Sequence, residues 1–208
     1  MQPVMALRSS FACLLALAAV LAPATAPASA HAAAPAFLAD QVALENARGA
    51  AQRAMAQRAV DGAQAVDGPL AGLRTDGAAA IPLRAPQRIR LLIAALNEIA
   101  GRPYKWGGGH RTLFDRGYDC SGAISYGLVR AGLLAYPLDS RLFMRYAAPG
   151  PGRYLTIYTS RGHAYMEVAG LRLDTSPVGD TIDGRTGVRW RPMIGRRPGF
   201  KVRHVPGL

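Results

Sequence analysis

Three consecutive glycines, Gly107 to Gly109, constrain this chain more than any other short stretch of its sequence. Glycine loses more backbone freedom on folding than other residues, so such a run is kept where the main chain must bend sharply or approach another group closely. A short polar loop follows, and Cys120 then opens an apolar, Ala-rich run that predicts a helix. The sequence therefore predicts a thiol at a helix N-terminus, where the helix dipole and the orphan N–H groups favour the reactive thiolate.

The first thirty residues have the organisation of a secretory signal peptide. Arg8 supplies a positive charge, residues 11–22 form an apolar core too short for a comfortable membrane span, and residues 28–30 (Ala-Ser-Ala) match an A-x-A cleavage site. We predict that the mature chain begins at His31 and is secreted, either extracellular or associated with the cell wall. An uncleaved anchor is the alternative; after cleavage we expect no stable membrane insertion.

Export makes the cysteine count informative. The sequence holds 2 cysteines, and Cys13 lies inside the predicted signal peptide. The mature chain would keep one thiol, Cys120, in a compartment where thiols usually pair, so this thiol is either incidental or a nucleophile. The formal net charge of +12 favours polyanionic partners, which include nucleic acid, an anionic membrane and an anionic cell wall.

We predict three parts along the chain: the signal peptide (1–30), an Ala-rich helix or linker segment that is partly disordered (31–85), and one compact domain (86–208). Residues 36–60 have a helix-forming composition, and residues 61–85 carry the scattered glycines and prolines that are typical of a linker. The linker segment is expected to act as a tether, and an inhibitory or wall-associating helix is the alternative.

The compact domain is predicted to have an α+β fold, with helices packed on a small antiparallel sheet. Helical spacing of apolar residues predicts a first helix that ends at Gly101, on positions Ile89, Leu92, Ile93, Leu96 and Ile99. A second helix follows Cys120, with Asp119 as its N-cap and a stripe of small residues at Ala123, Gly127 and Ala131. A loop with one short helix near 142–146 precedes the predicted strands, which are 154–158, 163–168, 171–176, 188–191 and 200–204.

A hairpin turn at Ala169-Gly170 would fix the register of two of these strands. Val168 then faces Leu171, and Glu167 faces Arg172, with which it would form a cross-strand ion pair. One face is apolar and consists of Ala164, Met166, Val168, Leu171 and Leu173. The other is polar, and a one-residue slip would bury its charges; it consists of His163, Tyr165, Glu167, Arg172, Asp174 and Ser176.

The same register brings together three residues that suit nucleophilic catalysis. A thiolate needs a base to hold its proton, and the base needs a third group to hold its orientation. Asp174 lies diagonal to His163, about 6–8 Å away at Cβ, within reach of a side-chain hydrogen bond. We therefore predict Cys120, His163 and Asp174 as catalytic residues. His110, in the glycine loop, is a candidate substrate contact.

Two other uses of these residues are less well supported. Zinc requires about four ligands, usually at short paired spacings such as C-x-x-C, and the sequence has none, so we expect no metal. Nucleic acid could exploit the positive charge, but the arginines are isolated and lack an aromatic-interleaved motif, so we expect no nucleic-acid partner.

These motifs resemble the NlpC-type cell-wall cysteine peptidases. The resemblance covers about residues 86–176, and its most specific parts are Tyr104-x-Trp106-Gly107-Gly108 and Asp119-Cys120-Ser121-Gly122, followed by Gly162-His163. It implies a papain-like α+β domain with the nucleophile Cys120 at a helix N-terminus and His163 as the base. The family's third polar residue is usually His, Asn or Gln, whereas the matching position here holds Asp174.

The resemblance also implies a function and a set of binding residues. Such enzymes cut amide bonds of peptidoglycan stem peptides, typically between D-γ-glutamate and the diamino acid, without a cofactor. Tyr104, Trp106, Asp119 and Ser121, together with His110, are the expected substrate contacts. We expect a monomer whose partner is peptidoglycan. The alternatives are an N-acetylmuramoyl amidase or a transferase using the same Cys–His pair, and a non-catalytic wall-binding module.

Overall fold

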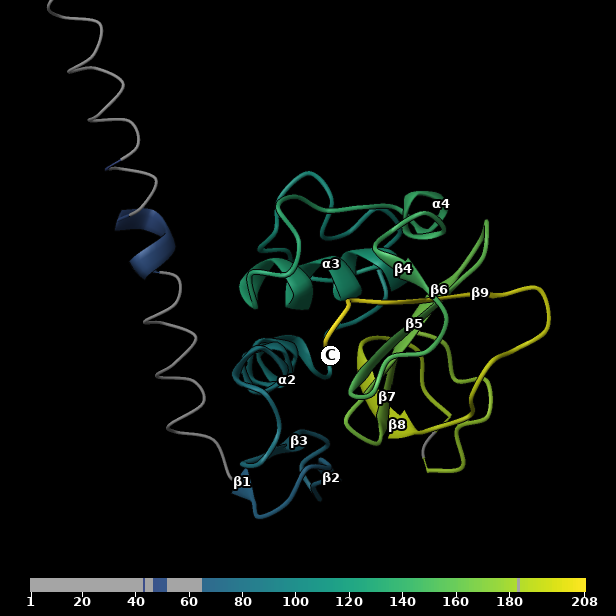
Figure 1. The fold of residues 1–208 in the computed structure, drawn as a ribbon. Helices are drawn as coiled ribbons and strands as arrows, with labels where there is room; N and C mark the ends of the chain where they lie inside the picture. The colour runs from purple at the N-terminus through teal and green to yellow at the C-terminus, as the bar shows by residue number, and fades with distance from the viewer. Residues whose placement is uncertain (1–42, 44–46, 52–64, 183) are drawn as a thin grey trace, which may run out of the picture. The chain divides into compact units, whose positions relative to one another are not determined.

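The computed structural model describes residues 43, 47–51, 65–182 and 184–208 (Figure 1). The predicted signal peptide lies outside the described residues, as does most of the predicted 36–60 helix, of which residues 47–51 are helical. All elements below belong to one of the two units into which the chain divides, residues 44–208. Within the described ranges, no helix has the length and apolar character needed to span a bilayer.

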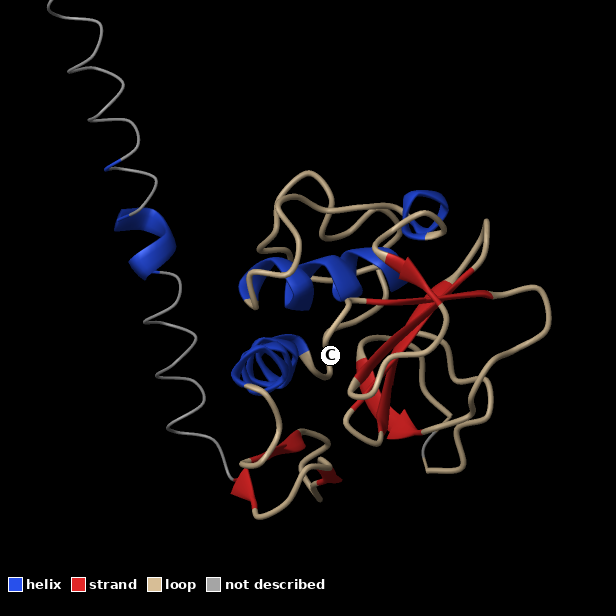
Figure 2. Ribbon diagram, viewed as in Figure 1, coloured by secondary structure: helices blue, strands red, loops and turns tan. Residues whose placement is uncertain are grey.

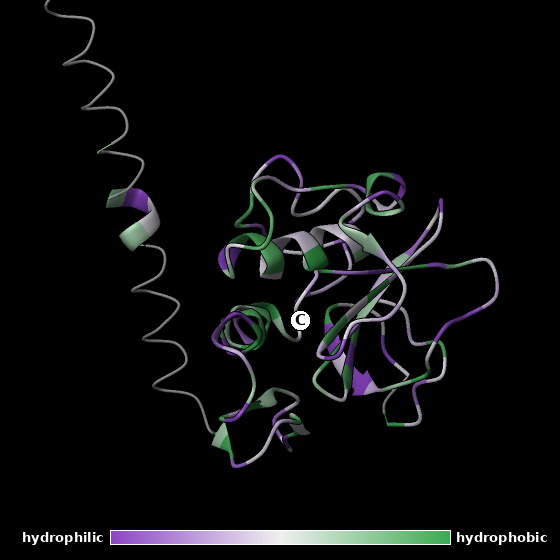
Figure 3. Ribbon diagram, in the orientation of Figure 1, coloured by the Kyte–Doolittle hydropathy of each residue, from purple (hydrophilic) through white to green (hydrophobic). Residues whose placement is uncertain are grey.

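Helices α2 (Gln87–Ile99) and α3 (Cys120–Arg130) lie side by side next to the main sheet (Figure 2). The apolar positions predicted for the first helix are all buried in α2, and Figure 3 shows apolar and polar residues on different sides of it. A Cβ at Gly127 of α3 would lie 2.7 Å from the Leu96 side chain, so this glycine lets the two helices pack closely. Both predicted helices are confirmed.

Part of the expected linker is folded. Strands β1 (Ala65–Val66), β2 (Gly72–Leu73) and β3 (Ala79–Pro82) form a small sheet with β3 in the centre. The Asn97 side chain of α2 accepts a hydrogen bond from the Ala79 N–H at 2.9 Å and donates one to the Ala79 carbonyl at 2.8 Å. The folded part therefore begins before residue 86, because these short strands are stabilised by a partner on α2 that local composition does not reveal.

The main sheet has six strands in the order β4-β9-β5-β6-β7-β8, and all neighbouring strands are antiparallel. Its strands are β4 (Ala148–Pro149), β5 (Leu155–Thr159), β6 (Ala164–Val168), β7 (Leu171–Asp174), β8 (Arg189–Pro192) and β9 (Lys201–His204). The predicted α+β class, with helices on an antiparallel sheet, is confirmed. The short helix α4 (Ser140–Phe143) begins earlier than predicted, because the Asp139 side chain caps it by accepting the Leu142 N–H.

The β6–β7 hairpin has the predicted register. Ala169 and Gly170 have φ angles of +47° and +93°, as a type I′ turn requires, and Val168 pairs with Leu171 and Glu167 with Arg172. The apolar face of the hairpin is buried in the main core, against which α3 packs. The sequence-based register is therefore confirmed.

The polar face of the hairpin is less exposed than expected, because Tyr165, Arg172 and Asp174 are buried and the other three residues are half-buried. The segment that leads into β9 covers it: the Tyr165 hydroxyl donates to the Gly195 carbonyl at 2.6 Å. The predicted ion pair between Glu167 and Arg172 is not among the ion pairs of the described residues. Glu167 instead accepts hydrogen bonds from the Tyr158 hydroxyl and from the N–H groups of residues 194 and 195, and Arg172 pairs with Asp174.

Candidate active site

Cys120 is the first residue of α3 and the one free cysteine of the described chain. Its residue surface is 8% exposed, and it reaches a cavity of about 400 Å³. Asp119 immediately before it is the N-cap, because its Oδ1 accepts the Gly122 N–H at 2.7 Å. The thiol is therefore held in the first turn of a capped helix, where N–H groups point away from the helix without intrahelical acceptors.

His163 lies at the end of the tight turn between β5 and β6. Ser160 fixes this turn, because its N–H donates to the His163 carbonyl at 2.8 Å and its hydroxyl lies 3.2 Å from the His163 N–H. The imidazole Nε2 is 2.9 Å from Asp174 Oδ1. Nε2 is thereby occupied, which leaves Nδ1 as the ring nitrogen that can face the Cys120 thiol.

Asp174 is the last residue of β7 and is almost completely buried, at 2% exposure. Its Oδ1 also accepts the Ser176 N–H at 2.8 Å, and its Oδ2 accepts a hydrogen bond from Arg172 Nη1 at 3.1 Å. The Arg172 guanidinium is itself fully buried and donates to the Val178 carbonyl at 2.7 Å. The carboxylate that orients His163 is therefore fixed on both oxygens.

The surroundings of His163 favour its protonated form. Burial lowers the pKa of the imidazole, but its hydrogen bond to the Asp174 carboxylate, its interaction with Cys120 and the charges of the same two groups outweigh burial and raise it to about 9. Cys120 is thus close enough to the ring to affect its pKa. At neutral pH this arrangement can hold an imidazolium near the Cys120 sulfur.

Asp119 connects the glycine loop to the start of α3. Besides capping the helix it accepts the Gly107 N–H at 3.0 Å and the Ser121 hydroxyl at 3.1 Å, and it contacts His110 Nε2 at 3.0 Å. Burial raises the pKa of Asp119, but these bonds, with that to His110 first, leave it lowered. The same pair raises the pKa of His110. The Asp119 carboxylate beside Cys120 therefore favours the protonated form of His110, and its hydrogen bonds offset part of its negative charge.

Close contact explains three glycines of the glycine loop and the first turn of α3. A Cβ at Gly108 would overlap the Gly117 carbonyl, and a Cβ at Gly122 would overlap the Gly108 carbonyl. Gly109, at φ +86°, would bring a Cβ to 2.7 Å from the Tyr118 ring. The loop can lie against the first turn of α3 only because these residues have no side chain.

All of the sequence-predicted substrate contacts line the same cavity as Cys120. They are Tyr104, Trp106, His110, Asp119 and Ser121. The Trp106 side chain is 87% exposed at the cavity, and the pKa of the Tyr104 phenol is raised by burial and then by the charges of Cys120 and Asp119. The structure therefore brings the predicted site residues together; their roles as substrate contacts stay predictions.

The sequence analysis missed the other side of the cavity. This side consists of Asp139, Ser140, Arg141, Arg161 and Gly162. These residues lie in α4 and in the β5–β6 turn, and the Ser140 hydroxyl donates to the Arg161 carbonyl at 3.2 Å, which joins the two segments. The capping pattern Asp-Ser at the start of α4 was the available signal for the helix, but nothing local indicates that this helix faces Cys120.

The part of the chain that the structure describes contains no group of three or more His, Cys, Asp or Glu side chains placed to hold a metal ion. The site's own side chains and main chain supply a nucleophile, an imidazole and helix N–H groups. This set suits attack on a carbonyl carbon.

A comparison of the sequence with protein-family models gives no match, and no curated protein matches it. Among solved structures, the chain is similar to the peptidoglycan hydrolase RipB from Mycobacterium tuberculosis. The sequence identity is 21%, the TM-score is 0.43, and the superposition covers 60% of this chain and 74% of the RipB chain. A similarity at this level identifies neither the family nor the activity of this chain.

Proposed function

We propose that this chain is a secreted cysteine-dependent hydrolase that cuts amide bonds in peptidoglycan stem peptides. The observation that carries the proposal is the continuous arrangement of Cys120, His163 and Asp174, in which a buried carboxylate lies 2.9 Å from the imidazole that interacts with the thiol. An imidazole with a pKa of about 9, in the residue that follows Gly162 of the cavity wall, is suited to proton transfer in catalysis.

The reaction follows from the positions of these groups. The Cys120 sulfur attacks the peptide carbonyl carbon, and the developing oxyanion accepts hydrogen bonds from N–H groups of the first turn of α3. The C–N bond then breaks, and His163 gives its proton to the leaving amine. Water attacks the thioester while His163 takes up a proton, the C–S bond breaks, and the free acid leaves. Asp174 keeps the ring in position throughout.

The substrate class rests on four observations from the sequence and the site. The motifs around Tyr104, Cys120 and His163 resemble those of NlpC-type wall peptidases, and residues 1–30 have the organisation of an export signal. A net charge of +12 suits an anionic envelope. The cavity at Cys120 is large enough for a short peptide segment, at about 400 Å³. The bond proposed is that between D-γ-glutamate and the diamino acid.

Digestion of purified sacculi tests the proposal. The protein should release stem-peptide fragments whose mass spectra show a new D-glutamate carboxyl terminus and a new diamino-acid amino terminus. Cys120→Ala and His163→Ala should each abolish release. The matched control is His204→Ala, because this imidazole contacts the Gly150 carbonyl at 3.1 Å and does not line the cavity.

The alternatives predict other outcomes of the same experiment. An N-acetylmuramoyl amidase would free the amino terminus of the whole stem peptide, and a transferase would yield products with new amide bonds. A non-catalytic wall-binding module would release nothing and would show a Cys120 thiol that is inert to iodoacetamide at neutral pH. Undiminished release by Cys120→Ala would rule out the proposed mechanism. Recovery of a chain that begins at His31 from the culture medium or cell wall tests secretion.

A further inference from the structure

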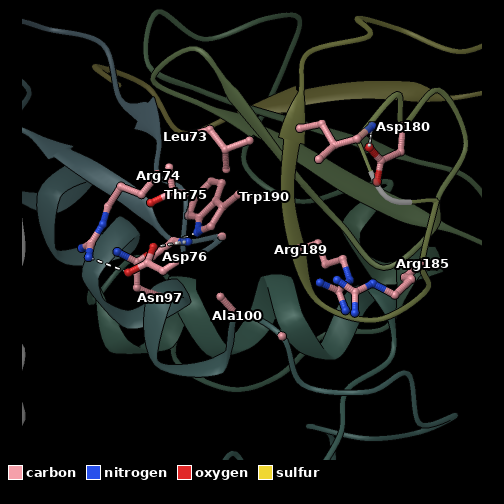
Figure 4. A pocket seen from close by; sticks show the side chains of 14 residues that line it. Leu73, Arg74, Thr75, Asp76, Asn97, Ala100, Asp180, Arg185, Arg189 and Trp190 are labelled. Atoms are coloured by element: carbon pink, nitrogen blue, oxygen red, sulfur yellow. Dashed lines mark hydrogen bonds and ion pairs between the residues drawn. The ribbon is translucent and has the colours of Figure 1, made fainter.

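Two further cavities are present among the described residues. One of about 500 Å³ lies at the end of α2 beside Trp190 (Figure 4). Its two carboxylates already have partners, since Asp76 pairs with Arg74 and Asp180 with Arg191, and Trp190 donates to Asn97 at 2.8 Å. This cavity contains no nucleophile and no unpaired acid, so it gives no indication of a ligand.

The other cavity has a uniform charge. It measures about 580 Å³ and is lined by Arg141, Leu142, Met144, Arg145, Arg161 and Lys201, which we call the basic pocket. All four of its ionisable residues are exposed cations, and none of them takes part in the ion pairs recorded for the described residues. Four unneutralised cations around one concave surface produce a positive potential that attracts an anion.

The basic pocket is formed by three segments that are held together by hydrogen bonds. The Thr159 hydroxyl of β5 donates to the Ser140 carbonyl of α4 at 2.6 Å, and Thr159 also pairs with Lys201 of β9 in the sheet. The Arg203 side chain of β9 donates to the Met144 carbonyl just after α4. The relative positions of the cations are therefore set by the fold and not by flexible loops alone.

The basic pocket is adjacent to the cavity that contains Cys120. Arg141 and Arg161 line both of them. A peptide whose scissile carbonyl lies at Cys120 can therefore extend past these two arginines toward Arg145 and Lys201. Guanidinium groups bind carboxylates through paired N–H donors, and lysine adds a point charge.

We infer that the basic pocket binds a carboxylate of the substrate peptide near the cleaved bond, and that it selects peptides with free carboxylates over their amidated forms. This inference rests on the proposed function, since it assigns the charge of the substrate of that same site. The pocket contacts a part of the peptide that does not react, so its charges should stabilise the bound substrate and the transition state equally. A free carboxylate should therefore lower KM more than it raises kcat.

A pair of synthetic stem peptides tests the inference. The two peptides are identical except that the carboxylates flanking the cleaved bond are free in one and amidated in the other. We expect the wild-type protein to prefer the free acid roughly tenfold in kcat/KM at low salt, the size expected for a few exposed charge contacts. The preference should shrink toward onefold in 0.5 M salt, because such contacts are screened.

A variant that lacks two of the charges of the basic pocket provides a second test of the inference. Arg145→Gln/Lys201→Gln should reduce the preference to about twofold or less while the kcat/KM for the amidated peptide stays within about twofold of wild type. The matched control is Arg74→Gln/Arg84→Gln, which removes the same charge from two arginines that pair with Asp76 and Asp67. Arg74 is half-buried and Arg84 is exposed, and neither lines the basic pocket or the Cys120 cavity, so this control should keep the wild-type preference.

The outcomes distinguish failure of the basic-pocket inference from failure of the proposed function. If the wild-type protein cleaves both peptides equally well at low salt, the inference is wrong although the proposed function stands. If it cleaves neither peptide nor sacculi, the proposed function fails first. If the double variant keeps the preference, or if it loses binding only to a phosphate polymer such as teichoic acid, the pocket does not read substrate carboxylates. The wild-type salt series decides the question even where the double variant does not fold.

Discussion

Replacement of Asp174 by asparagine is the sharpest test of how the site is tuned. The substitution keeps the size of the side chain and removes the charge that faces His163 Nε2 at 2.9 Å. In the wild-type protein the pKa of His163 is raised from 6.5 to about 9, which corresponds to about 3 kcal/mol in favour of the imidazolium. Asp174 and Cys120 share this contribution, and both act against the burial of the ring.

The raised pKa of His163 determines the direction in which activity changes with pH. The reactive pair contains the imidazolium, so activity should be lost as the pH rises through the folded pKa of His163, near 9. In Asp174→Asn the alkaline limb of kcat/KM should move from about 9 toward 6.5. At pH 8 we expect kcat/KM to fall roughly tenfold or more, because fewer molecules carry the imidazolium and the ring is less well oriented.

The assay is the pH dependence of kcat/KM on a stem peptide, read between pH 5 and pH 10. Glu167→Gln is the matched control, since Glu167 lies on the same hairpin face but accepts its hydrogen bonds from Tyr158 and from two backbone N–H groups. The control should keep the wild-type alkaline limb. A folded Asp174→Asn protein with an unchanged alkaline limb would refute the assignment of Asp174.

Three further predictions concern stability and can be measured by urea unfolding. Gly122→Ala should destabilise the fold by about 2 kcal/mol or more because its Cβ would overlap a backbone carbonyl, whereas Gly162→Ala, which has nothing within 4 Å, should be nearly neutral. Asp119→Ala should cost about 1–3 kcal/mol, more than Asp139→Ala, which caps only the short α4. The raised pKa of His163 contributes stability that is complete below pH 6.5 and is lost as the pH rises through about 9, so His163→Gln should flatten this decline.

The elements that the sequence predicts correctly are those with a strong local pattern. Helix α2 has apolar residues at helical spacing, and the β6–β7 hairpin has strict alternation on both sides of Ala169-Gly170. The alternation fixes the register, and the register brings His163 and Asp174 together. The candidate site was therefore predictable as far as it depends on local periodicity and one turn.

The features that the sequence does not reveal depend on partners distant along the chain. Residues 65–85 look like a linker because their strands are two to four residues long, and their order depends on the contact of Ala79 with Asn97 of α2. The burial of Arg172 depends on the segment near Gly195 that covers the hairpin, where alternation alone predicts a solvent-facing surface. Arg161 joins the cavity through its contact with Ser140.

The two reacting groups come from different layers of the molecule, with the sulfur on α3 and the imidazole on the turn that leads into β6. Neither layer alone contains both groups, so the thiol meets its base only after the helices have docked onto the strands. During refolding, the rate at which Cys120 becomes more reactive toward an alkylating agent than an unfolded thiol therefore measures the rate of this docking step.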